Sequence, residues 1–367
     1  MPRIDEVLQL GRESNASDIH FTPGQPPLMR IDGELRPSQL PVLAPEDSSG
    51  MMLEVLTPSQ RQVFDDHGAA DFTYMVQGVG RYRVNLCRHH AGVSGFCRVI
   101  PNEVPDLTTL GLPRVVTHLA RLRTGLVLVT GTTGTGKSTT LASLINEINV
   151  NQSFNIITLE DPVEFIHQSH RSLIVQREVG THVHTFKDGL RAALREDPDV
   201  ILVGEMRDAD TVSLALEAAE TGHLVFGTLH TRGAAQTIDR IIDAHPSDNQ
   251  SQVRHALADN LRAVVSQELL RAADGRGRRV CAEILIVTFA IQQMIREGKS
   301  FQIAGAISTG RRLGMQQMDQ AMLALVRAGE VDPDDAFLRA EDKWGFAPFV
   351  KKPELLALAS GGTDKAA

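Results

Sequence analysis

Residues 131–138 read Gly-Thr-Thr-Gly-Thr-Gly-Lys-Ser and follow an apolar run at 126–129. Glycines allow a backbone to turn tightly and to approach an anion without a side chain in between. The N–H groups that such a loop exposes, together with the positive end of the next helix, bind phosphate. Beyond the loop, Leu141, Leu144 and Ile148 recur at helical spacing. The order of strand, glycine-rich loop and helix predicts a phosphate-binding loop in an α/β fold.

The chemistry of this loop predicts roles for individual side chains. We expect Lys137 to reach the β- and γ-phosphates of bound ATP, and the Ser138 hydroxyl to ligate Mg²⁺. ATP or ADP and Mg²⁺ are therefore the predicted cofactors. The residues of the loop and the adjoining helix that we expect to bind the nucleotide are Gly131, Thr132, Thr133, Gly134, Thr135, Gly136, Lys137, Ser138 and Thr139.

Two further strand-like runs lead to carboxylates. The run 156–159 leads to Glu160 and Glu164, and the run 200–203 leads to Glu205. In α/β sheets, ligands bind at the carboxyl ends of the parallel strands. Hydrolysis of a γ-phosphate needs a group that orients the attacking water, and a carboxylate can also accept its proton. Four apolar residues followed by an acid form a Walker-B arrangement, so Glu205 is expected beside the Mg²⁺ ion.

Two histidines and two arginines are weaker candidates. His223 precedes the apolar run 224–229 and His230 follows it, so either could contact the nucleotide, although a lone histidine is more often structural. Arg83 and Arg98 lie outside the α/β part of the chain. Either they supply positive charge to a phosphate from another domain or subunit, or they solvate an exposed sheet face.

Composition limits the classes of function. The 367 residues are 42% hydrophobic and 22% charged, as in a globular protein of about two domains. A net charge of −8 and 4% aromatic residues disfavour nucleic acid as a partner. Three scattered cysteines fit a reducing cytosol. We expect no secretory signal and no membrane span, since no run reaches the roughly 18 apolar residues of a membrane helix.

The pattern along the chain predicts a boundary. Residues 1–100 read as a small α+β domain, and prolines mark a linker at 101–113. The remainder alternates strand-like and helical runs and becomes mostly helical from about 290, which makes 114–352 one α/β domain with a helical end. The segment 353–367 is expected to be a flexible tail. Residues 210–221 and 253–271 show helical spacing.

Four segments, in this order, resemble the Walker A, Asp box, Walker B and His box of the type II/IV secretion ATPase superfamily, and in particular of its type IV pilus retraction ATPases. These segments are residues 131–138, 156–164, 199–205 and 221–230. Four further segments match the family pattern: residues 16–21, 24–27, 176–180 and 314–319. The resemblance covers about residues 5 to 340. It implies an α/β fold with a RecA-like P-loop NTPase core, a PAS-like α+β N-terminal domain and a helical C-terminal portion.

The resemblance also implies functional assignments. Glu164 becomes the catalytic glutamate and Glu205 the Walker-B acid, with Glu160, His223 and His230 in the nucleotide site. Arg83 and Arg98 are expected to reach the nucleotide from the N-terminal domain. The implied assembly is a homohexamer with nucleotide between subunits. Such a motor works in the cytoplasm on an inner-membrane pilus platform protein, with a paralogous ATPase as a further partner.

One segment departs from the retraction pattern. Retraction ATPases carry Ala-Ile-Arg-Asn-Leu-Ile-Arg-Glu, whereas residues 290–297 read Ala-Ile-Gln-Gln-Met-Ile-Arg-Glu. Gln292 and Gln293 leave open an accessory role or a divergent retraction motor. Pilus-extension and type II secretion ATPases are also near in pattern, although they are typically longer and often carry a tetracysteine insert. Two more distant candidate functions are a RecA-type nucleic-acid motor and a scaffold that binds ATP with little turnover.

Overall fold

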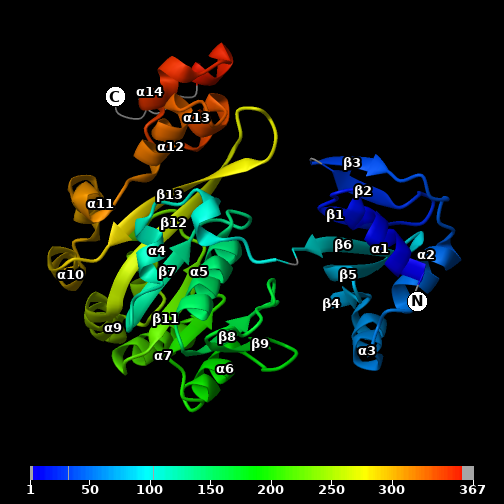
Figure 1. The fold of residues 1–367 in the computed structure, drawn as a ribbon, viewed down its shortest axis with the longest axis horizontal. Helices are drawn as coiled ribbons and strands as arrows, with labels where there is room; N and C mark the ends of the chain where they lie inside the picture. Colours follow the sequence, from blue (N-terminus) through cyan, green and yellow to red (C-terminus); the bar gives the residue numbers. More distant parts are fainter. Residues whose placement is uncertain (1–2, 32, 102, 358–367) are drawn as a thin grey trace. The chain divides into compact units, whose positions relative to one another are not determined.

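The computed structural model describes residues 3–31, 33–101 and 103–357, and the chain divides into two compact units between Glu103 and Val104 (Figure 1). Residues 104–113, which the sequence predicts to be linker, belong to the second unit. There Leu107 opens the 3₁₀ helix Leu107–Leu110 and is buried in the core. In the expected tail, Pro353–Leu356 forms another 3₁₀ helix, and residues 358–367 lie outside the described part.

The first unit is a six-stranded antiparallel sheet in the order β3-β2-β1-β6-β5-β4, packed with three helices. Its core includes Phe21, Phe64 and Tyr82, and the Tyr82 hydroxyl donates to the Leu8 carbonyl at 2.8 Å. This is the α+β arrangement that the sequence predicts. The elements are α1 (Arg3–Glu13), β1 (Asp18–Phe21), β2 (Leu28–Ile31), β3 (Glu34–Pro37), α2 (Pro45–Leu53), α3 (Pro58–His67), β4 (Ala69–Val76), β5 (Gly80–His89) and β6 (Gly92–Ile100).

The second unit is built on a seven-stranded sheet in the order β13-β12-β7-β11-β10-β8-β9. Neighbouring strands are parallel except β12 and β13, which form an antiparallel hairpin. Four of these strands follow the apolar runs that predicted them, so the α/β fold class is confirmed. The strands are β7 (Gly125–Thr130), β8 (Asn155–Glu160), β9 (Leu173–Glu178), β10 (Val200–Val203), β11 (Leu224–Leu229), β12 (Leu261–Arg271) and β13 (Arg278–Ile286).

Helices cover both faces of this sheet, as strands without polar alternation require. Leu126 and Leu128 of β7 point to the core beneath α6–α11, whereas Val127 and Val129 point to the core beneath α4 and α5. The covering helices are α4 (Val115–Leu119), α5 (Lys137–Asn151), α6 (Phe186–Ala193), α7 (Ala209–Glu220), α8 (Ala234–Asp243), α9 (Ser247–Asn260), α10 (Phe289–Arg296) and α11 (Ile303–Thr309).

The predicted helix at 253–271 is wrong beyond Asn260. Helix α9 ends there, and residues 261–271 form strand β12 beside β7. The apolar spacing of Leu261, Val264 and Val265 fits a helix by coincidence, because all three are fully buried in a two-sided sheet core. Burial on both faces removes the alternation that identifies a strand.

The hairpin of β12 and β13 carries a separate C-terminal cluster. Leu270 and Cys281 of the hairpin pack with Met322 and Phe337 from the helices that follow. Within 3–31, 33–101 and 103–357, no helix has the length and apolar character needed to cross a membrane. The helices of the cluster are α12 (Met318–Arg327), α13 (Pro333–Arg339) and α14 (Lys343–Phe346).

Candidate active site

The phosphate loop lies where the wholly buried strand β7 ends and α5 begins. Gly131 has a φ of 139°, and a Cβ there would lie 2.4 Å from the Gln267 carbonyl oxygen on β12. Gly134 and Gly136 have φ of 83° and 89°, with no atom within 4 Å of where a Cβ would be. The first glycine therefore permits close packing against the sheet, and the other two leave an open surface that a phosphate can approach.

Lys137 is folded against this loop. Its Nζ donates to the carbonyl oxygens of Gly131 and Thr132 at 2.8 and 3.0 Å, and the residue is 9% exposed. Burial lowers the pKa of the Lys137 ammonium, and the negative charges of Glu205 and Glu164 oppose that shift. Three of the predicted catalytic residues, from three separate segments, thus lie within electrostatic reach of one another.

The hydroxyl residues of the loop differ in exposure. Thr133 and Ser138 are exposed, whereas Thr132 and Thr139 are half-buried. Thr135 is 3% exposed and donates through Oγ1 to the Thr132 carbonyl at 2.9 Å, so it stabilises the loop from within. Ser138, in the first turn of α5, is placed on the open side, as a metal ligand requires.

Glu205 follows β10, and its carboxylate contacts the side chains of Arg207 and His230. Its Oε1 accepts from Arg207 Nε at 2.5 Å and lies 2.9 Å from His230 Nε2. Burial opposes ionisation, but the hydrogen bonds and charges of Arg207 and His230 outweigh it and lower the pKa of Glu205. The carboxylate is therefore anionic at neutral pH and held at the carboxyl edge of the sheet. The sequence analysis did not identify Arg207 as a site residue. Its contact with Glu205 depends on the turn that follows β10.

The two histidines lie at opposite edges of the sheet. His230 follows the carboxyl end of β11 and faces Glu205, but His223 precedes the amino end, where Leu224 pairs with Gly125. His223 Nδ1 lies 2.9 Å from the Ala218 carbonyl oxygen. The six residues of β11 separate the two ends by about 20 Å. The structure thus does not bring His223 to the phosphate loop, because a strand spans the sheet between it and His230.

Glu160 and Glu164 also have different surroundings. Glu160 ends β8, and its Oε1 accepts from Thr158 Oγ1 at 2.6 Å and from Gln176 Nε2 at 3.1 Å. Glu164 is exposed between Val163 and Phe165, which are 7% and 5% exposed. Two buried neighbours anchor the loop on either side of Glu164, so its carboxylate is presented on a fixed backbone.

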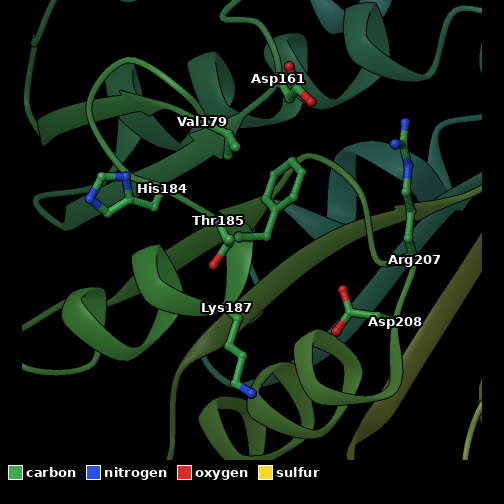
Figure 2. Close-up of a pocket in the computed structure, with 8 residues that line it drawn as sticks. Asp161, Val179, His184, Thr185, Lys187, Arg207 and Asp208 are labelled. Atoms are coloured by element: carbon green, nitrogen blue, oxygen red, sulfur yellow. The ribbon is translucent and has the colours of Figure 1, made fainter.

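A cavity of about 330 Å³ lies beside this site (Figure 2). Asp161 borders it from the turn after β8, and Arg207 and Asp208 border it from the turn after β10. None of its lining residues belongs to the phosphate loop. The cavity therefore adjoins the proposed hydrolytic centre without being the nucleotide cradle. Its other lining residues are Val179 and residues 184–187.

Arg83 and Arg98 belong to the first unit and are direct cross-strand partners on β5 and β6. Both are exposed, and Arg98 Nε donates to Asp18 Oδ1 at 2.9 Å. Like charges directly opposite each other destabilise a sheet, and the carboxylate of Asp18 offsets the charge of Arg98 here. The register that pairs them could not be read from the sequence.

Comparisons with known proteins show what the chain is similar to. Residues 2–332 match the family model described as "Type II/IV secretion system protein". The chain is 48% identical to a twitching motility protein of Neisseria gonorrhoeae, over 86% of this chain and 84% of that protein. It is 44% identical to the type IV pilus retraction ATPase PilT of Pseudomonas aeruginosa, over 92% and 98%. A crystal structure of the pilus retraction motor PilT with bound ADP superposes with a TM-score of 0.85 at 43% identity, over 97% of this chain and 99% of that one.

Proposed function

The chain belongs to the type II/IV secretion system protein family, and from that premise we propose that it is an ATPase motor that retracts type IV pili. One observation carries the enzymatic part of the proposal. Lys137, Glu164 and Glu205 all follow the carboxyl ends of parallel strands in one RecA-like sheet, and the loop before Lys137 leaves room for phosphate. The relatives that are named for twitching motility and pilus retraction supply the process in which the ATPase acts.

The residues present fit ATP and Mg²⁺. The backbone of residues 131–136 is open at Gly134 and Gly136, and Lys137 presents an ammonium whose present partners are carbonyl oxygens. Phosphate oxygens can take over those hydrogen bonds. Ser138 and Glu205 would hold the metal, either directly or through its water shell. The metal, when bound, neutralises charge on the β- and γ-phosphates.

The acidic loop supplies the remaining chemistry. Glu164 orients the attacking water and accepts its proton, because it is exposed and near Lys137. Glu160 has its carboxylate directed toward Thr158 and Gln176, so we assign it to shaping the site. His230 and Arg207 both contact the carboxylate of Glu205. Through this contact, His230 connects the end of β11 to the residue that would hold the metal.

Arg83 and Arg98 act on a neighbour's nucleotide in a ring, which we propose to be a homohexamer. Positive charge supplied across an interface stabilises charge that grows in the transition state, so its loss lowers kcat more than nucleotide affinity. We expect Arg83→Ala/Arg98→Ala chains and Glu164→Gln chains to be inactive separately and to regain ATPase activity when mixed. Exchange is followed with a labelled subunit. If subunits exchange and no activity returns, the arginines do not act in trans.

We propose that the motor works on the cytoplasmic side of the inner membrane, with the pilus platform protein as its partner. Deleting the gene tests the retraction function. Twitching should stop and surface pili should accumulate, and the wild-type chain should reverse both changes. The half-buried Gln292 and Gln293 on α10 favour a second candidate, an accessory motor that works with a paralogous ATPase. Twitching that persists, and stops only when the paralogue is also deleted, would assign the accessory role.

A further inference from the structure

The segment Gln-Arg-Glu-Val-Gly at 176–180, which no step of the hydrolytic mechanism uses, begins in the last three residues of strand β9 and continues into the turn after it. The strand forms the edge of the sheet and pairs in parallel with β8. Gln176 lies opposite Thr158, and Glu178 lies opposite Glu160. This register places two polar side chains of β9 beside the loop that leaves β8 and carries Glu164.

Both the oxygen and the nitrogen of the Gln176 side-chain amide form hydrogen bonds with that loop. Its Oε1 accepts from the His167 N–H at 2.8 Å. Its Nε2 donates to the Phe165 carbonyl oxygen at 2.8 Å and to Glu160 Oε1 at 3.1 Å. One side chain thus connects the end of β8 to two backbone groups in the middle of the loop.

Glu178 holds the same loop nearer its start. Its Oε2 accepts from the Val163 N–H at 3.0 Å, and its Oε1 accepts from Thr181 Oγ1 at 3.0 Å. The backbone on both sides of Glu164 is therefore hydrogen-bonded to β9, through Val163 on one side and Phe165 on the other. Arg177, between the two, instead pairs with Glu196 at 2.8 Å.

We propose that Gln176 and Glu178 are positioning residues for hydrolysis, which hold residues 163–167 so that Glu164 faces the phosphate loop. The inference rests on the proposed role of Glu164 as the base. Neither residue needs to touch the substrate. A displacement of a reacting group by about 1 Å costs on the order of 100-fold in rate, so hydrogen bonds to the loop backbone are sufficient to control turnover.

A double-mutant cycle tests this coupling. Gln176→Leu should lower kcat by about 10- to 100-fold while the Kd for a non-hydrolysable ATP analogue stays within about threefold. Combined with Glu164→Gln, it should slow turnover no further, because the positioned group is already lost. Arg177→Gln is the matched control on the same strand and should retain near wild-type kcat. Multiplicative losses in the double variant would overturn the proposal.

Two substitutions separate positioning from general destabilisation. Gln176→Glu keeps the acceptor for His167, but at about pH 8 its carboxylate faces Glu160 and Glu178 and cannot donate to Phe165. Its kcat relative to wild type should rise as the pH falls and the introduced carboxyl becomes a donor. Gln176→Leu should show no such recovery. Glu178→Gln retains an acceptor for Val163 and should exceed Glu178→Leu in kcat.

Hydrogen exchange gives an outcome that does not depend on catalysis. Gln176→Leu should raise the exchange rate of the His167 amide, and Glu178→Leu should raise that of the Val163 amide, while the amides of α5 keep their protection. Unchanged exchange at both amides would overturn the positioning role, whatever the kinetics. If exchange rises but Glu164→Gln turns over normally, the positioning of Glu164 is also overturned, and the fault lies in the assignment of the base.

Discussion

The phosphate loop and the acidic loop after β8 meet at one site but are held in different ways. The phosphate loop is fastened by backbone and buried groups: Gly131 packs on Gln267, and the buried Thr135 bonds back to Thr132. The acidic loop is fastened by half-buried side chains on an edge strand, Gln176 and Glu178. Nucleotide binding is thus built into the sheet interior, whereas the water-activating group depends on contacts near the surface.

This difference predicts that substitutions separate into two classes. Changes at the phosphate loop should alter nucleotide affinity, and changes at the acidic loop should alter turnover. Affinity and turnover can be measured independently with a non-hydrolysable analogue and with phosphate release. A substitution in the acidic loop that weakened analogue binding as much as it slowed turnover would contradict the separation.

The largest effect is expected for Lys137→Ala. Removing the ammonium that faces the β- and γ-phosphates should weaken ATP binding at least about 100-fold and abolish phosphate release. Lys299→Ala is the matched control, since Lys299 is exposed after α10 and pairs with the exposed Glu297 at 2.6 Å. Calorimetric titration with a non-hydrolysable analogue measures the affinity of both variants, and phosphate release measures their turnover. Unchanged affinity in Lys137→Ala would remove the phosphate-loop assignment.

Glu164→Gln should come next and should affect turnover alone. The amide cannot accept the proton of the attacking water, so kcat should fall by about 100-fold or more while ATP still binds. Bound, uncleaved ATP should accumulate and can be measured after rapid quenching. Glu160→Gln is the comparison. If Glu160→Gln abolishes turnover and Glu164→Gln does not, the roles of the two carboxylates are reversed.

Arg207→Gln should shift a pH profile. Arg207 helps to lower the pKa of Glu205 against the effect of burial. A carboxyl with a lowered pKa stays ionised above the pKa of the folded state and loses its charge only as the pH falls through that value. Removing Arg207 should therefore move the acid limb of the ATPase profile to higher pH. A limb that stays in place would mean that Glu205 does not limit activity in acid.

The smallest effect is expected at Gln267, on the phosphate-loop side. Its Nε2 donates to Thr140 Oγ1 at 2.8 Å, between β12 and the first turns of α5. Gln267→Met should lower the free energy of unfolding by about 1–2 kcal/mol, because it leaves a buried hydroxyl with fewer partners. The exposed Gln302→Met is the control. Urea unfolding with and without ATP measures whether the loss also weakens binding.

Local patterns predicted the parts of the site that local sequence determines. The phosphate loop and the four apolar strands were predicted because glycine spacing and two-sided burial leave direct marks in the sequence. Lys137 and Glu205 were expected together because the carboxyl ends of parallel strands share one edge. The α/β class and the family were predicted from the phosphate loop and from the strand-like runs with the residues that follow them. The comparisons confirm both predictions.

The remaining features depend on contacts between distant segments. The strand character of residues 261–271 was missed because full burial hides alternation. The resemblance implied that His223 lies in the nucleotide site, whereas it precedes the amino end of β11. The contact of Arg207 with Glu205 comes from a turn. The hydrogen bonds of Gln176 depend on the register of β9 against β8. No spacing rule within one segment contains that information.

The order of the sheet has a consequence for synthesis on the ribosome. Strand β7, which carries the phosphate loop, lies between β11 and β12, and these begin only at Leu224 and Leu261. A nascent chain therefore cannot complete the sheet on both sides of β7 until residues 261–266 of β12, which pair with β7, have left the exit tunnel. The first unit has its own core and can complete its fold earlier. Translation thus completes the sheet around the strand that carries the phosphate loop only when most of the chain exists.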